Sequence, residues 1–196
     1  MKALLINGSP RPNGCTFTAL TELANTLEAE GIETEIVHVG NKDIRGCIAC
    51  RRCHSTGSNK CVFDDIVNEV IDGNKAAHGP CGNAPPDGVA KCVFDDIVNE
   101  VAPKLAEADA FVIGAPVYFG SPAGGAISFM DRLFFSTLNI DKTMKVGASV
   151  VTCRRGGNTA SYDVLNKYFT MCGMPVASSQ YWNMVYGGSA EEVKKD

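Results

Sequence analysis

The chain has 196 residues, a formal net charge of -4 and a sequence pI near 5.4. This length fits one domain with a buried core and leaves little room for a second domain. The acidic balance, without a stripe rich in Lys and Arg, argues against nucleic acid as a partner.

Strands and helices alternate along the chain, as in a parallel sheet covered by helices on both faces. The apolar run at 3–6 is typical of a strand buried on both sides. Further strands are predicted at 33–39, 110–119, 146–152 and 175–182. Helices are predicted at 16–30, at about 123–135 and at 160–171. The pattern predicts a doubly wound α/β fold with five parallel strands in the order 2-1-3-4-5.

The end of the chain offers only a helix start at Ser189, in the sequence GGSAEEVKKD. A doubly wound sheet needs a closing helix at this point. We therefore expect that the last helix is missing, so that the chain is truncated or a partner covers that face.

The eleven residues KCVFDDIVNEV occur twice, at 60–70 and at 91–101. The residues between the copies are rich in Gly, Pro and Asn, which is typical of a flexible loop. Solenoid repeats drift in sequence and need at least three units, so this identical pair indicates a tandem duplication. We expect a single domain over 1–196 with an inserted segment at about 60–90, and either copy fits the one helix before the strand at 110–119.

The turn NGSPRPNGCT, at 7–16, joins the first strand to the first helix. A helix start presents unpaired N–H groups and the positive end of the helix dipole, which together favour an anion. The residues that add donors, positive charge or close backbone approach are Ser9, Arg11, Gly14, Cys15 and Thr16. The spacing matches neither the ATP nor the dinucleotide glycine motif. The turn is therefore a candidate phosphate site, with a Pro/Gly-rich surface turn as the alternative.

Two further loops are expected beside this turn, because ligands of such sheets bind where the first and third strands part, at their carboxyl ends. The loop at 115–124, APVYFGSPAG, carries the aromatic pair Tyr118 and Phe119. The loop at 152–158, TCRRGGN, offers positive charge and glycine N–H groups for the edge of a reduced ring; its candidate residues are Thr152, Arg154, Arg155 and Gly156. A phosphate cradle beside an aromatic platform suits a flat, phosphorylated cofactor.

The segments LLINGSPRPNGCTFTAL, GAPVYFGSPAGGAISFMDRLF and SSQYWNMVYG resemble the NADPH-dependent FMN reductase family of flavodoxin-like proteins. GCIACRRC and KCVFDD resemble its iron-sulfur flavoprotein branch. The likeness covers nearly the whole chain apart from the duplicated segment. It implies non-covalently bound FMN, NAD(P)H as co-substrate, and a homodimer or homotetramer. It also implies phosphate contacts from Ser9, Arg11, Cys15 and Thr16 and ring contacts from Pro116, Val117, Tyr118, Phe119 and Gly120.

Four cysteines form a C-x2-C-x2-C-x7-C run, at Cys47, Cys50, Cys53 and Cys61. Thiolates two residues apart can turn toward one iron-sulfur cluster or zinc ion. The chain has nine cysteines and no export signal, which favours metal or redox chemistry over disulfides. The resemblance implies a [4Fe-4S] cluster on these four residues. Zinc and an empty thiol loop stay open, and Cys92, in the second repeat copy, competes with Cys61.

These patterns predict an FMN-dependent NAD(P)H oxidoreductase that reduces a quinone, a flavin or a similar small acceptor, or passes electrons through a cluster to a redox protein. No catalytic acid or base is predicted, because the flavin carries the chemistry. One alternative is a non-enzymatic electron carrier, and another is a structural zinc module with an empty crevice. No apolar run reaches the ~18 residues of a membrane span, so we expect a cytoplasmic protein without membrane contact.

Overall fold

The computed structural model describes residues 1–44, 96–137 and 140–196. They fall into two compact units. The first contains 1–43, 107–127 and 142–196, and the second contains the helical segments within 96–106 and 128–137. Whether the whole chain is one domain stays a prediction.

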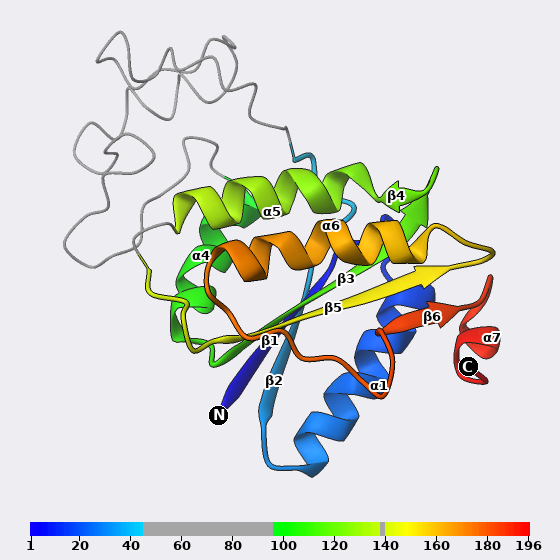
Figure 1. Cartoon of the computed structure of the whole chain (residues 1–196), viewed down its shortest axis with the longest axis horizontal. Coiled ribbons are helices and arrows are strands. Elements are labelled where there is room, and N and C mark those ends of the chain that lie inside the picture. The colour runs from blue at the N-terminus through cyan, green and yellow to red at the C-terminus, as the bar shows by residue number, and fades with distance from the viewer. Residues whose placement is uncertain (45–95, 138–139) are drawn as a thin grey trace, which may run out of the picture. The chain divides into compact units, whose positions relative to one another are not determined.

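The first unit is built on a parallel sheet with the strand order β2-β1-β3-β5-β6 (Figure 1). Its strands are β1 (Lys2–Asn7), β2 (Glu33–His38), β3 (Ala110–Tyr118), β5 (Val146–Cys153) and β6 (Met184–Tyr186). Counted in chain order, these five strands have the predicted order 2-1-3-4-5, so the doubly wound prediction is confirmed. A short strand, β4 (Ser121–Pro122), pairs antiparallel with the end of β3.

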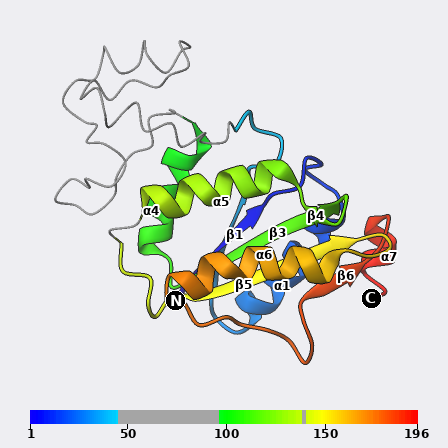
Figure 2. The ribbon, with the colours of Figure 1, turned by 45° about the horizontal axis from the view of Figure 1, so that its top comes forward.

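Two helices cover opposite faces of this sheet, α1 (Cys15–Ala29) and α6 (Asn158–Met171) (Figures 1 and 2). Leu20 of α1 shares a buried cluster with Val112 of β3. On the other face, the ring of Phe169 from α6 lies against Phe111, the neighbour of Val112 along β3, with centroids 6.1 Å apart. Because successive strand residues point to opposite faces, the two helices enclose the sheet between them.

The fifth parallel strand lies later in the chain than predicted. Within the predicted strand 175–182, only Val176 forms an isolated bridge, to Gly147, and the regular pairing with β5 begins at Met184. The side chain of Asn183 accepts the Ser179 N–H at 3.0 Å and donates to the Ala177 carbonyl at 3.3 Å. This amide closes a loop between the bridge and β6, which explains why the predicted strand does not continue from Val176. The chain then forms a single helical turn, α7 (Ala190–Val193), which Ser189 caps.

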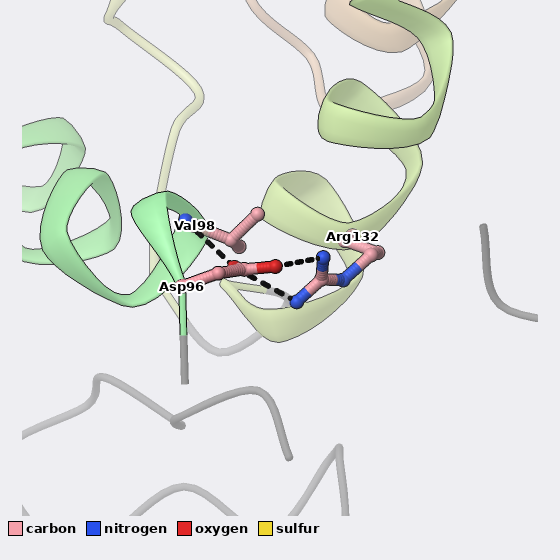
Figure 3. A network of polar contacts seen from close by, with 3 residues as sticks. All are labelled: Asp96, Val98 and Arg132. Carbon is pink, nitrogen blue, oxygen red and sulfur yellow. Dashed lines mark hydrogen bonds and ion pairs between the residues drawn. The ribbon is translucent and has the colours of Figure 1, made fainter. Parts of the chain in front are cut away.

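The second unit contains most of α4 (Ile97–Glu107) and most of α5 (Gly124–Ser136). Asp96 accepts the Val98 N–H at 3.1 Å and so caps the start of α4. The same carboxylate binds the Arg132 guanidinium from α5 at 2.6 and 3.0 Å, as Figure 3 shows. Asp96 to Val101 belong to the second repeat copy, so this copy forms the described helix. The first copy lies outside the described residues.

Candidate functional site

Three loops meet at the carboxyl edge of the sheet in the first unit. The Gly8 N–H, in the turn after β1, donates to the Gly114 carbonyl of β3 at 2.8 Å. The hydroxyls of Thr16, in α1, and Thr152, in β5, lie 2.8 Å apart and are both buried. These contacts join the loop after β1 to the ends of β3 and β5, as the sequence predicts for a ligand crevice.

The loops after β3 and β5 also touch each other directly. A Cβ added to Gly157 would lie 2.7 Å from the Gly120 Cα and 3.1 Å from a methyl of Val117. Gly157 has φ 87°, which a residue with a side chain rarely adopts. Only glycine at position 157 therefore allows the loops at 115–124 and 152–158 to approach so closely.

The candidate phosphate turn, residues 7–16 and called the phosphate turn below, has a defined shape that Asn7 sets. Asn7 is fully buried; its Oδ1 accepts the Ser9 N–H and its Nδ2 donates to the Pro12 carbonyl, both at 3.1 Å. The Ser9 Oγ accepts the Arg11 N–H at 3.2 Å. This bond uses an acceptor site of the hydroxyl, so the hydroxyl hydrogen can still donate to a ligand.

The start of α1 suits an anion. Its N-cap is Gly14, which has no side chain to satisfy the first N–H groups, and no acidic residue lies in the first turn. The Thr18 N–H donates to the Gly14 carbonyl at 3.0 Å, which closes the first turn. By helix geometry, the N–H groups before Thr18 have no intrahelical acceptor. Their partial positive charge can be satisfied by phosphate oxygens.

The predicted side-chain donors of this turn differ in their surroundings. Arg11 is exposed and Ser9 is buried in the turn. The Cys15 thiol donates to the Gly187 carbonyl at 3.6 Å, and the Thr16 hydroxyl lies against Thr152. Cys15 and Thr16 would therefore contribute chiefly their backbone N–H groups, whereas Ser9 and Arg11 would contribute side chains.

The backbone at the tip of β3 is strained at an aromatic residue. Phe119 and Gly120 are the two residues between the paired Tyr118 and Ser121, and both have positive φ, 52° and 75°. Positive φ at both positions is typical of a type I′ hairpin turn, in which a residue as bulky as Phe is unusual. The Phe119 side chain is fully exposed and Tyr118 is partly so. The positive φ of Phe119 costs free energy, and the turn presents an apolar ring to solvent. Strained backbone of this kind is common at ligand-binding sites.

The loop after β5 combines exposed charge with buried polar groups. Arg154, Arg155 and Gly156 are exposed, so the two guanidinium groups can turn toward a ligand. Burial raises the pKa of the adjacent Cys153 thiol, which is therefore neutral at physiological pH. Asn158 begins α6 and is buried, and its Nδ2 lacks a partner among the described residues.

The metal prediction falls on residues that the structure does not describe: Cys47, Cys50, Cys53 and Cys61. The alternative ligand Cys92 is also outside the described residues. Within the described ranges, no group of three His, Cys, Asp or Glu side chains could hold a metal ion. Cys15, Cys153 and Cys172 are free thiols there.

An apolar cavity of about 130 Å³ lies at the opposite edge of the sheet, between α1 and the starts of the strands. Ala3, Ala110 and Val146 line it, and each lies at or near the amino end of its strand. Ligands of doubly wound sheets bind at the carboxyl ends. This cavity is therefore separate from the candidate site.

The structure adds two roles that sequence reasoning does not assign. Asn7 lies within the predicted turn 7–16 but is given no role there. His38 lies within the predicted strand 33–39, and its Nε2 lies 2.8 Å from the Ser9 carbonyl oxygen. Gly40 also lies against Ser9. An Asn directly after an apolar strand and before Gly-Ser is a sequence signal that could have indicated Asn7. The position of His38 requires the pairing of β1 with β2.

The fold and the converging loops define a flavodoxin-like protein with a candidate site for a phosphorylated planar cofactor. A family model described as NADPH-dependent FMN reductase matches residues 1–80 and 81–188. The chain belongs to this family of flavin-dependent oxidoreductases. An iron-sulfur flavoprotein from Methanocaldococcus jannaschii is 29% identical over 191 residues, which are 96% of this chain and 82% of the relative.

Solved structures of flavin-related proteins share the fold, including the following two. A flavodoxin from the domain Archaea has a TM-score of 0.54 and 13% identity, with 100% of this chain and 90% of the other covered. An NAD(P)H:quinone oxidoreductase from Methanothermobacter marburgensis has a TM-score of 0.59 and 13% identity, with coverage of 96% and 84%. The flavodoxin-like prediction is thereby confirmed. In the described residues, no helix has the length and apolar character needed to cross a membrane.

Proposed function

We propose that the protein binds FMN at the carboxyl edge of the sheet and uses it to transfer hydride from NAD(P)H to a small acceptor such as a quinone or a flavin. The observation that carries the proposal is the convergence of three loops: an uncapped helix start, an exposed aromatic tip and a loop with two exposed arginines. Together these features supply an anion site, a flat apolar surface and positive charge.

Each loop has a distinct role in this proposal. The N–H groups at the start of α1, with Ser9 and Arg11, bind the phosphate. Tyr118 and Phe119 offer apolar surface to the ring. Arg154 or Arg155 stabilises negative charge that develops on the reduced ring. When bound, FMN supplies the hydride and electron chemistry, so no acidic or basic side chain is needed to move the reacting proton.

The family model supports this function, because it is described as NADPH-dependent FMN reductase and matches residues 1–80 and 81–188. The NAD(P)H:quinone oxidoreductase from Methanothermobacter marburgensis shares the fold at 13% identity. Measurements with NADH and NADPH test which nucleotide the protein uses.

Titration and rapid kinetics test the proposal. Purified protein stripped of flavin is titrated with FMN, and the complex is mixed without oxygen with NADH or NADPH while the flavin absorbance is followed. Saturable FMN binding and rapid bleaching support the oxidoreductase. Folded protein that fails to bind FMN contradicts the site, and bound flavin that neither nucleotide reduces supports the electron carrier instead.

We also propose that the cysteine loop holds a [4Fe-4S] cluster, because a relative that covers most of this chain is an iron-sulfur flavoprotein. Iron and sulfide analysis after anaerobic purification tests this, with zinc measured in parallel. The variants Cys61→Ser and Cys92→Ser identify the fourth ligand, because only the true ligand should reduce the iron content when replaced. Zinc in place of iron, or no metal, would contradict the cluster.

The remaining expectations are a cytoplasmic location and a homodimer or homotetramer that passes electrons to a small acceptor or a redox protein. Light scattering during size-exclusion chromatography measures the assembly. A monomer at working concentration would contradict it.

A further inference from the structure

The end of β2 contacts the backbone of the phosphate turn. The His38 Nε2 lies 2.8 Å from the Ser9 carbonyl oxygen. A carbonyl oxygen only accepts hydrogen bonds, so Nε2 carries the hydrogen and donates it. His38 pairs with Asn7 in the β1–β2 register, which brings the end of β2 beside the turn that comes after β1.

The chain after His38 adds a second support. The N–H groups of Val39 and Gly40 donate to the Asn7 carbonyl at 3.0 and 3.2 Å. A Cβ added to Gly40 would lie only 2.1 Å from the Ser9 carbonyl oxygen, so the backbone at Gly40 is in close contact with Ser9. The segment 38–40 therefore fixes the rear of the turn.

The buried side chain of Asn7 holds the same turn through the Ser9 N–H group. Its Oδ1 accepts the Ser9 N–H, while His38 donates to the Ser9 carbonyl. Both backbone polar groups of Ser9 thus have partners that are not ligands. These bonds orient the Ser9 hydroxyl and the start of the Arg11 segment before any ligand arrives, which reduces the ordering cost of binding.

We infer that His38 is a positioning residue that makes the site prefer a phosphorylated flavin over riboflavin. The inference rests on the proposed binding of FMN. His38 acts through the Ser9 backbone, so its effect falls on the phosphate end of the ligand. Riboflavin has the same ring but no phosphate, and its binding depends on the loops after β3 and β5.

Affinities for FMN and riboflavin, measured by fluorescence titration of flavin-free protein, test the inference. His38→Ala should weaken FMN binding about 3- to 10-fold, the value of one hydrogen bond, and leave riboflavin binding unchanged. His38→Gln offers a side-chain N–H in a similar place and should restore most of the FMN affinity.

Thr34→Ala is the matched control. Thr34 lies on the same strand and the same face as His38, about 13 Å along the strand, and loses a hydrogen bond to Glu28 when replaced. It should leave both affinities unchanged. Thermal unfolding of each variant without flavin checks that the fold is retained.

The outcomes separate this inference from the proposed function. Wild-type protein that does not bind FMN contradicts the proposed function itself. If wild type binds FMN more tightly than riboflavin but His38→Ala keeps the same ratio, or weakens both equally, the role of His38 is wrong. Equal wild-type affinity for the two flavins also overturns it.

Discussion

The ion pair between Asp96 and Arg132 should determine how stably α4 forms, and its loss gives a measurable effect. The Arg132 side chain is 2% exposed and that of Asp96 is 22% exposed. Removing one partner of a buried pair costs about 3–5 kcal/mol, and the partial exposure of Asp96 places this pair at the lower end. Asp96→Ala also removes the cap at Val98. We expect a loss of about 3 kcal/mol in the free energy of unfolding.

The assay is equilibrium unfolding in urea, because guanidinium would screen the pair. With a slope of about 2 kcal/mol per molar, the midpoint should fall by about 1.5 M. Hydrogen exchange of the α4 amides shows whether the loss is local to that helix. Asp96→Asn keeps an oxygen for the cap but removes the charge, and should cost less than Asp96→Ala.

The repeat supplies an internal control. Asp65 holds the same position in the first copy, KCVFDDIVNEV at 60–70, as Asp96 holds in the second. Because Asp96 binds Arg132 through both carboxylate oxygens, Asp65→Ala should change the free energy of unfolding by less than about 0.5 kcal/mol. Equal effects of the two substitutions would refute the reasoning and indicate that both copies occupy the helix. A loss below about 1 kcal/mol for Asp96→Ala would show that the pair adds little.

Three further predictions concern the first unit. Gly147→Val should destabilise it by about 1–3 kcal/mol in urea unfolding, because a Cβ there would lie 2.5 Å from the Phe169 ring; a neutral result would mean that the ring can move aside. Cys153 should react with iodoacetamide more slowly than Cys172 at pH 8, because burial raises the pKa of the Cys153 thiol. Peptide mass spectrometry measures the two rates, and equal rates would contradict this burial. The stability that this raised pKa contributes is present below the ordinary thiol pKa of about 8.5 and is lost as the pH rises above it. Arg154→Ala or Arg155→Ala should slow flavin reduction in stopped-flow mixing by about 10-fold or more, and unchanged rates in both variants would remove the proposed charge stabilisation.

Much of the fold was predictable from local sequence patterns. The apolar run at 3–6 predicts a strand, and the helical spacing of apolar residues at 16–30 predicts a helix. Both patterns lie within the segment that forms the element, so no distant residue is needed to recognise them. The phosphate turn was also visible, because Gly, Pro and Ser between a strand and a helix indicate an anion site without knowledge of distant residues. The strand order resulted from the general rules of doubly wound sheets.

Features that depend on distant residues were decided only by the tertiary structure. His38 joins the site because β2 pairs with β1, and nothing in its own segment indicates that contact. The hydroxyl contact between Thr16 and Thr152 joins residues on two elements far apart in the chain. The last strand also begins later than the predicted 175–182, because the Asn183 side chain closes a loop first.

The duplicated segment separates most clearly what the local sequence predicts from what the tertiary structure decides. Two identical segments have the same helix propensity, so the sequence of the repeat by itself cannot select the copy that forms α4. The residues after the two copies differ: Leu105 comes after the second and is fully buried, whereas Asn74 holds the matching position after the first. Burying an amide without partners costs free energy, and burying Leu lowers it. Local sequence therefore specified that a helix forms before β3, and tertiary burial decided which residues form it.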